Sequence, residues 1–217
     1  HVLFPYLNGE DLNSRPDCSA RRWIIDFNDR PEEESAKFSL PYSRILDVVK
    51  PERATNNRKV YREYWWQFGE RRPALRKAIT ELDNVLVLTR VSDTLMPIRV
   101  SSAQVFSDRL TVFASDSLTL LGVLSSSIHS LWAIKYGTTH ETRVTYNPSA
   151  VFETFPRPAT TYGVTAAGEL LDTGRREVML RREFGLTHLY NLVNDPQITE
   201  ASEPDIARMR AIHVELD

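Results

Sequence analysis

Three side chains near the middle of the chain have types and a spacing that suit the reading of DNA bases. Glu141, Arg143 and Thr145 alternate within residues 138–146, so on an extended strand they would share one face. A carboxylate can accept a hydrogen bond from cytosine N4, and an arginine can hold guanine O6 and N7 with both arms of its fork. The pattern therefore favours an exposed strand that presents hydrogen-bonding groups to base edges. The alternative for Arg143 is an ion pair with Glu141.

The residues before this strand predict a long helix that would position it. Asp116 can cap the helix N-terminus by accepting hydrogen bonds from free backbone amides. About twenty residues would form a rod of roughly 30 Å, and Gly137 would end it. The apolar residues recur at helical spacing; they are Leu118, Leu121, Leu124, Ile128, Leu131 and Trp132.

A second group of candidates could surround the bases with positive charge. Residues 44–77 contain ten Lys or Arg and four Asp or Glu, whereas residues 159–217 contain six Arg and ten acidic residues. Contacts to phosphates fix a protein on the duplex, so the basic stretch predicts a phosphate-binding surface. For each member the alternative is a solvated surface charge. The candidates are Lys50, Arg53, Arg58, Lys59 and Arg62.

Motifs for catalysis are absent from this sequence. It has no glycine-rich phosphate loop, no GxSxG motif and no cysteine pair for zinc. None of its lysines follows an acidic residue at the spacing of a PD-(D/E)xK nuclease. The five histidines are dispersed, and His129 is expected to be a packed or hydrogen-bonded residue. Asn147-Pro148-Ser149 lacks the second proline and the aromatic residue of an adenine-holding loop, so it predicts a helix start. We therefore expect no catalytic residue, metal or cofactor on this chain.

The remaining pattern predicts an α/β (α+β) fold. A mixed or antiparallel small sheet would pack on the long helix, and a small all-helical C-terminal segment would follow. Residues 84–91 are apolar on both faces and predict an interior strand. Residues 107–109 predict a turn, and the segment around Pro51 is expected to end a helix over 42–49. Proline-rich residues 155–158 predict a boundary between domains 1–157 and 158–217.

Composition narrows the setting of the chain. The net charge of −2 gives no global attraction to nucleic acid. The single cysteine, Cys18, excludes an internal disulfide and fits a reducing compartment, so we expect a cytoplasmic protein. The absence of an 18-residue apolar run predicts no membrane partner. Trp65 and Trp66 are interpreted as core residues, with stacking on a base as the alternative. We interpret the chain as a fragment of a longer protein.

Several motifs, taken in order, resemble the C-terminal part of single-chain DNA adenine-N6 methyltransferases and restriction-modification proteins of the MmeI-like, type IIL kind. The resemblance covers nearly the whole chain: its recognition-domain motifs are followed by a tail, residues 186–191 and 205–217, similar to that family's helical domain. The recognition-domain motifs are residues 22–27, 49–53, 65–69, 122–129, Trp132, Arg143, Tyr146 and 152–156.

The resemblance implies a function in reading double-stranded DNA. In this family a separate domain binds S-adenosylmethionine and transfers the methyl group, so that cofactor is expected outside this chain and that catalytic domain is an expected intramolecular partner. The alternative is a docking module that packs on the catalytic domain without reading bases. The family's base-reading zones fall on the strand and on an earlier loop; here they correspond to Glu141, Arg143 and Thr145, and to Ser107, Asp108 and Arg109.

Overall fold

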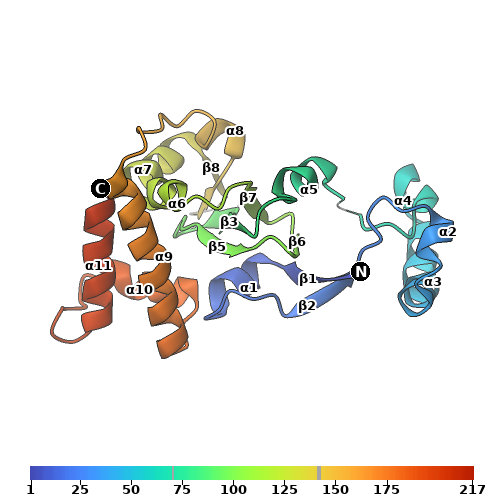
Figure 1. The fold of residues 1–217 in the computed structure, drawn as a ribbon, viewed down its shortest axis with the longest axis horizontal. Coiled ribbons are helices and arrows are strands. Elements are labelled where there is room, and N and C mark those ends of the chain that lie inside the picture. The colour runs from blue at the N-terminus through green and yellow to red at the C-terminus, as the bar shows by residue number, and fades with distance from the viewer. Residues whose placement is uncertain (70, 141–142) are drawn as a thin grey trace.

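The computed structural model describes residues 1–69, 71–140 and 143–217, with only the backbone of His140. In these residues, three small three-stranded sheets occupy the centre of the molecule, and helices lie around them and at both ends (Figure 1). The strands are β1 (Leu3–Leu7), β2 (Arg22–Ile25), β3 (Asn84–Thr89), β4 (Val91–Ser92), β5 (Ile98–Ser101), β6 (Val105–Phe106), β7 (Leu110–Phe113), β8 (Thr138–His140) and β9 (Arg143–Thr145).

Most described helices before residue 160 have ten residues or fewer, with α3 (16 residues) as the exception, and the longest helix, α9 (21 residues), lies after it. The described part of the chain is thus a mixed α/β fold that ends in an all-helical segment, as the sequence predicts. The helices are α1 (Gly9–Ser14), α2 (Glu32–Ser35), α3 (Ser39–Ala54), α4 (Lys59–Glu63), α5 (Pro73–Ile79), α6 (Leu118–Ser125), α7 (Ser127–Tyr136), α8 (Pro148–Val151), α9 (Tyr162–Arg182), α10 (Leu186–Asn194) and α11 (Pro204–Leu216).

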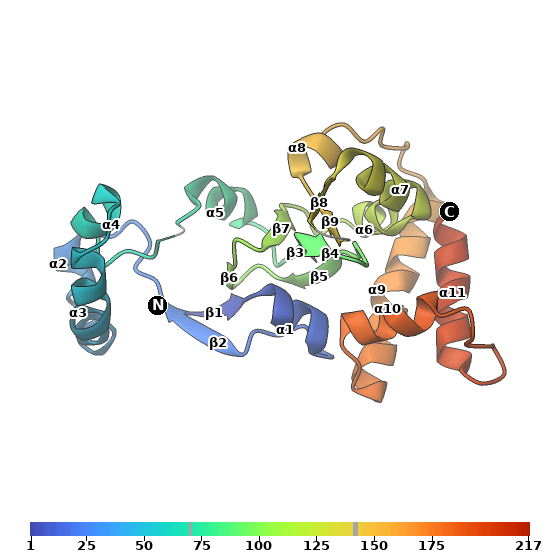
Figure 2. The same cartoon turned by 180° about the vertical axis from the view of Figure 1, so that it is seen from behind.

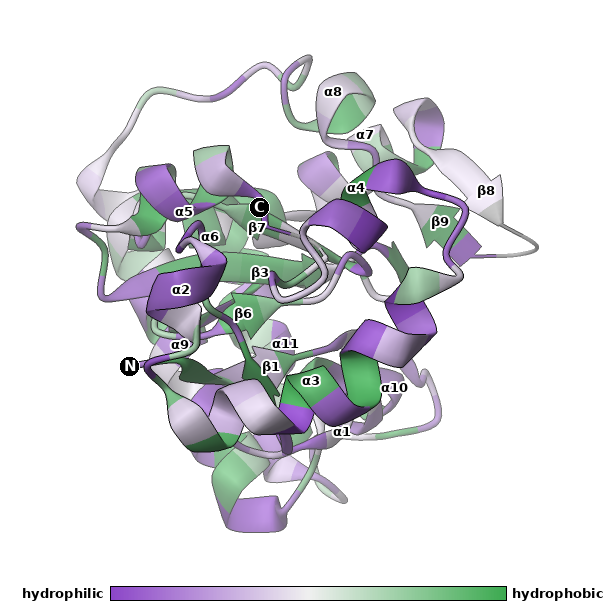
Figure 3. Ribbon diagram, turned by 90° about the vertical axis from the view of Figure 1, so that its right-hand side faces the viewer, coloured by the Kyte–Doolittle hydropathy of each residue, from purple (hydrophilic) through white to green (hydrophobic). Residues whose placement is uncertain are grey.

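The central strand of the second sheet forms the middle of the core. β3 lies between β5 and β7, antiparallel to both. Its four residues from Val85 to Leu88 are fully buried, which confirms the interior strand predicted from the two apolar faces. Seen along the long axis, the central strands β1 and β3 are green while the outer helices α2 and α4 are largely purple (Figure 3).

The other two sheets flank this core. β1 pairs antiparallel with β2 and parallel with β6, and β9 lies between β4 and β8, antiparallel to both. β4 follows β3 after a single residue, Arg90, so the chain passes directly from the core sheet into the sheet that contains β9. This passage places the predicted reading strand beside the core.

The predicted long helix is wrong in one respect, because it is two helices that meet at an angle of 63°. Ser126 interrupts it with an extended backbone (ψ 155°). Its hydroxyl donates to Val123 O at 2.8 Å and accepts from His129 N at 3.2 Å. One serine thus caps the end of α6 and the start of α7, an example of a short polar side chain competing with helical hydrogen bonds. The apolar spacing continues across this break and does not reveal it.

The two ends of this helix pair also differ from the predicted details. Ser117, one residue after Asp116, is the N-cap, and its hydroxyl accepts from Leu120 N at 3.2 Å. Gly137 does end α7, but with an extended backbone (φ −70°). Glycine is required there for space, since a Cβ would lie 2.5 Å from Ala133 O. No single described helix is long and apolar enough to span a membrane. α6 and α7 together reach that length and composition, but bent as described.

Residues 28–69, named here the helical lobe, form one end of the molecule (Figures 1 and 2). A small hydrophobic cluster of Val2, Phe27, Ile45 and Trp65 holds the lobe to the N-terminal strands. Trp65 is buried, and Trp66 donates to Arg30 O at 2.9 Å, so both tryptophans have the structural role favoured by the sequence.

Helix α3 is longer than the sequence predicts. It begins at Ser39 and includes Pro51 in its interior, so the expectation that Pro51 ends the helix is wrong. Proline removes one backbone hydrogen bond and strains the preceding turn. Packing compensates for that loss, because Arg53, two residues later, donates to Trp65 O at 2.9 Å and fastens the end of α3 to the following segment.

The C-terminal helices pack closely on the first of the paired helices. A Cβ on Gly168 of α9 would lie 2.0 Å from Leu118 O of α6, so the two backbones touch at this glycine. Buried residues of α9, α10 and α11 belong to the same hydrophobic cluster as β3. Asp217 accepts from Ser127 N at 2.7 Å, which joins the chain end to the start of α7. The domain boundary after residue 157 stays a prediction, and the helices beyond it share the main core.

Candidate nucleic-acid interface

The predicted reading strand is one arm of a hairpin. In the described residues of the hairpin, Thr138 pairs with Thr145 and His140 with Arg143, while Val91 of β4 pairs with Thr145 on the other side. Arg143 is exposed, and Thr145, two residues along and therefore on the same face, is half-buried. Glu141 lies outside the described residues. The structure therefore places two of the three predicted base readers, and Arg143 is the more accessible.

A buried hydrogen-bonded pair anchors this hairpin from below. His129 of α7 is fully buried, with its Nδ1 2.9 Å from Leu124 O and its Nε2 3.1 Å from the hydroxyl of Tyr146. Since a carbonyl only accepts, Nδ1 donates, and Nε2 therefore accepts from the tyrosine. Burial lowers the pKa of His129 to about 4, with the Leu124 carbonyl opposing that shift, and burial raises the pKa of Tyr146. The prediction of a packed, hydrogen-bonded histidine is confirmed.

The second predicted reading zone is the tight turn between β6 and β7. Leu110 N donates to Ser107 O at 3.1 Å and closes the turn. Ser107 is 5% exposed, and its hydroxyl lies 3.1 Å from an Asp108 carboxylate oxygen and 3.2 Å from Arg109 N. Its side chain therefore builds the turn, and its burial does not support a base contact. Asp108 and Arg109 are exposed at the turn.

The two zones meet at Arg90, a residue that no local sequence pattern marks as functional. Arg90 N donates to Arg109 O at 2.8 Å, and Arg90 O accepts from Tyr146 N at 2.7 Å. Its two peptide groups thus connect the β6–β7 turn to the residue that follows β9. We name Arg90 with these two partners the Arg90 junction. A charged residue at the end of an otherwise apolar strand was the available signal, because a buried strand rarely continues through an exposed arginine.

The basic side chains predicted to bind phosphates all lie in the helical lobe, and protein groups already engage them. Arg53 is half-buried, its guanidinium donates to Trp65 O at 2.9 Å and to Gln67 O, and burial lowers its pKa. Such an arginine holds the chain together, so its burial does not support a phosphate contact. Lys50 is exposed and lies 4.6 Å from the centre of the Trp65 ring.

The other three candidates lie on or beside helix α4. Arg58 is 3.3 Å from the Tyr61 hydroxyl, and Arg62 donates to Asn56 O. Lys59 forms an exposed ion pair with Glu63 at 3.4 Å. These contacts are at the surface, so Arg58, Lys59 and Arg62 remain accessible to a phosphate that outcompetes a weak local partner.

Comparison with known proteins identifies the family. The family model of the MmeI target recognition domain matches residues 5–159. The chain belongs to the MmeI target recognition domain family. It is also similar to a solved structure, that of the type IIL restriction-modification enzyme MmeI in complex with DNA, at a TM-score of 0.67 and 17% identity. The match covers 100% of this chain and 27% of the MmeI chain, so the chain spans about a quarter of that protein. No curated protein matches the chain.

The MmeI family assignment and the structural match confirm the predictions of family and fold class, and that of a domain for sequence-specific DNA recognition. The alternative of a docking module that does not read bases receives no support. The individual base and phosphate contacts stay predictions. In the part of the chain that the structure describes, no three His, Cys, Asp or Glu side chains gather as a metal site would require.

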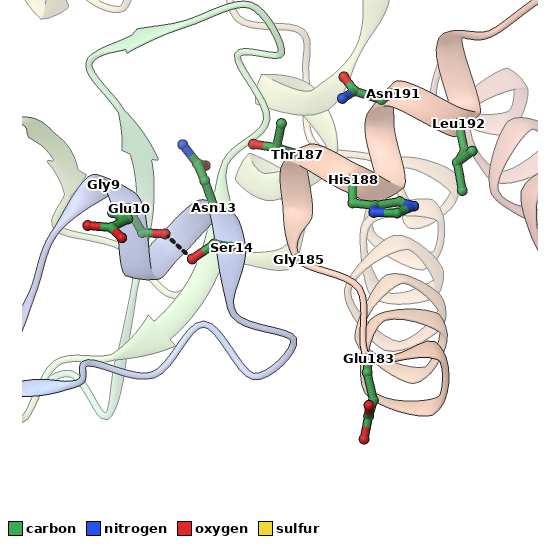
Figure 4. A pocket seen from close by; sticks show the side chains of 10 residues that line it. All are labelled: Gly9, Glu10, Asn13, Ser14, Glu183, Gly185, Thr187, His188, Asn191 and Leu192. Atoms are coloured by element: carbon green, nitrogen blue, oxygen red, sulfur yellow. Dashed lines mark hydrogen bonds between the residues drawn. The ribbon is translucent and has the colours of Figure 1, made fainter.

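The chain also has a cavity of about 700 Å³ between α1 and α10. Both views in Figures 1 and 2 place these helices on the opposite side of the central strands from β8. Glu10 and Glu183 contribute negative charge to its lining, which suits a phosphate backbone poorly. By its position the cavity is separate from the reading elements, and by its charge it does not favour DNA. Figure 4 shows its polar side chains, which come mainly from the two helices: Glu10, Asn13, Ser14, Thr187, His188 and Asn191.

Proposed function

We propose that this chain reads double-stranded DNA with two elements that act together, the β8–β9 hairpin and the β6–β7 turn. Arg143 is the hairpin residue that contacts a base edge, with Thr145 and Glu141 as its proposed neighbours. Asp108 and Arg109 are the proposed readers on the turn. An arginine fork suits guanine, and a carboxylate suits the amino group of cytosine.

The observation that carries this proposal is the Arg90 junction. Its hydrogen bonds of 2.8 Å to Arg109 O and 2.7 Å from Tyr146 N fix the turn and the hairpin to each other through backbone groups. Precise spacing between reading elements matters, because hydrogen bonds to base edges tolerate little displacement. The buried hydrogen bond between His129 and Tyr146 also anchors the end of the hairpin to helix α7.

We further propose that the chain works within a longer protein that methylates adenine N6. The donor S-adenosylmethionine would bind a separate catalytic domain, an intramolecular partner of the recognition domain. This division of labour is supported by the family assignment and by the small share of the MmeI chain that is matched. The isolated chain should transfer no methyl group from S-adenosylmethionine to DNA. Measurable transfer would contradict the division.

Selection from a randomised duplex pool tests the reading function. The wild-type chain should enrich one sequence over successive rounds of binding, and an Arg143→Ala variant should lose preference at a single position. The expected cost is about 1–3 kcal/mol at that base pair, with the other positions unchanged.

A matched control separates this effect from a general loss of positive charge. Arg22 is also an exposed arginine on a strand, but it lies on β2, in a different sheet. Arg22→Ala should leave the selected sequence and its information content unchanged. Identical sequence preferences for wild type and Arg143→Ala would show that Arg143 does not read a base. A wild-type chain that enriches no sequence would contradict the proposed function of the chain alone.

A further inference from the structure

Two exposed arginines adjoin at the Arg90 junction, and neither forms an ion pair with a described residue. Thr89 pairs with Leu110 at the end of the β3–β7 ladder, and Arg90 N donates to Arg109 O at the next position. Both side chains are exposed. Directly opposed residues in an antiparallel pair have Cβ atoms about 5 Å apart, and like charges there are destabilising. The backbone hydrogen bond thus brings the two residues together just beyond the end of the ladder, where both side chains are exposed.

The described part of the chain offers these two guanidinium groups no internal partner. Among the described residues, the hydrogen bonds of Arg90 and Arg109 are made by their backbone groups and not by their guanidinium groups. Asp108 lies beside Arg109 in sequence, but its carboxylate accepts from the Ser107 hydroxyl at 3.1 Å. This situation differs from that of the lobe arginines, which contact carbonyls or rings. An anion bound by Arg90 would relieve the repulsion between the two charges.

We propose that Arg90 binds a phosphate of the DNA backbone beside the base that Arg109 reads. Arg109 lies on the turn itself, whereas Arg90 lies one step back, on the chain between β3 and β4. In a groove the base edges form the floor and the phosphates form the rim. A side chain set back from the inserted turn therefore meets the rim. A guanidinium also matches two phosphate oxygens with two parallel hydrogen bonds.

This inference rests on the proposed DNA-reading function but assigns a residue and a role outside it. Arg90 would fix the register of the turn on the duplex without contributing to sequence choice. Arg109 would contribute to choice. The two neighbours, alike in charge and exposure, thus have different expected effects when each is removed.

Binding to DNA at several salt concentrations tests this assignment. The 217-residue chain is titrated with the duplex enriched by the wild type and with a random duplex pool, from about 50 to about 200 mM salt. Arg90→Ala should weaken binding to both DNAs by the same factor. The slope of log affinity against log salt should become less steep by about one. Arg90→Lys should restore the slope, since it restores the charge.

Two further variants complete the experiment. Arg109→Ala should change the preferred sequence, and Arg22→Ala should change neither preference nor slope. An unchanged salt slope in Arg90→Ala overturns the phosphate contact, and so does a changed sequence preference. Failure of the wild type to prefer any sequence contradicts the proposed function, yet the slopes of Arg90→Ala and Arg90→Lys would still decide the phosphate contact. Circular dichroism of each variant checks that the fold is intact.

Discussion

The Arg90 junction and the helical lobe both contain exposed arginines, but their charges are used differently. In the lobe, Arg53 donates to backbone carbonyls, Lys50 lies over Trp65, and Lys59 pairs with Glu63. At the junction, the hydrogen bonds of Arg90 and Arg109 to other described residues are made by their backbones, and their guanidinium groups are exposed. The density of basic residues along a stretch therefore does not measure the charge available to DNA. A few arginines beside the reading elements whose guanidinium groups bond to no described residue should contribute more to DNA binding.

The two regions also differ in what holds them together. The junction is connected by backbone hydrogen bonds, with the buried pair of His129 and Tyr146 below it. The lobe depends on a cationic side chain, that of Arg53, to fasten the segment around Trp65 to the end of α3. Removal of a junction arginine should therefore alter binding, whereas removal of this lobe arginine should alter folding. Three measurements test that contrast.

The largest expected effect is on the stability of the lobe. Arg53→Ala leaves the carbonyls of Trp65 and Gln67 without their charged donor and should lower the free energy of unfolding by about 3 kcal/mol. Arg109→Ala should change it by less than about 0.5 kcal/mol, because its side chain is exposed and makes no bond within the described chain. Urea unfolding followed by tryptophan fluorescence measures both, since Trp65 is packed in the lobe.

The conservative variant sharpens this test. Arg53→Lys keeps the charge but lacks the fork needed to reach both carbonyls, so it should recover only part of the lost stability. Equal small effects of Arg53→Ala and Arg109→Ala would remove the contrast between the two regions.

The next largest effect is on the free energy of unfolding and depends on pH through His129, which packs beneath the hairpin. His129 has its pKa lowered to about 4 by burial, so the folded chain keeps it neutral while the unfolded chain protonates it near 6.5. The unfolded state therefore binds more protons between these values, and stability falls as the pH drops below about 6.5. From pH 7 to pH 5 the expected loss is about 2 kcal/mol for this residue.

His213 adds to the same trend and needs its own control. Its pKa is also lowered to about 4, mainly by burial and further by Arg175. Urea unfolding at pH 7 and pH 5 should show a clearly smaller pH-dependent loss for His129→Gln than for wild type, with His213 responsible for the remainder. The same pH dependence in His129→Gln and wild type would show that the His129 imidazole is not buried and neutral in the folded chain.

The sequence predicts the junction's elements better than their connection. Periodicity identifies β3, the turn at Ser107, and the strand that contains Arg143, because each has a local signature of apolar alternation or turn residues. The contact of Arg90 with Arg109 and Tyr146 joins residues far apart in sequence. No local pattern encodes such pairing, since register depends on how whole strands align.

The errors around the paired helices have a related cause. Apolar spacing runs through Ser126 unchanged, so it predicts a continuous helix, while the break depends on hydrogen bonds of one hydroxyl. At Pro51 the helix is predicted too short instead of too long. The local preference of proline to end a helix is outweighed there by contacts of Arg53 with a distant segment. The sequence predicts a phosphate surface in the basic lobe because it shows the charges of the side chains but not the groups that pair with them.

The smallest expected effect is on DNA affinity, and it tests whether a lysine that already forms an ion pair can still attract DNA. Lys59 is 77% exposed and lies 3.4 Å from Glu63. Lys59→Ala should weaken binding to all sequences alike, by less than Arg90→Ala does, because Glu63 already offsets part of its charge. Glu63→Gln should have the opposite effect, with slightly tighter binding and a steeper salt slope, since it frees the lysine. Both are measured by the same salt titration. A change of preferred sequence in Lys59→Ala would contradict a phosphate role, and an effect larger than that of Arg90→Ala would reverse the ranking of the two regions.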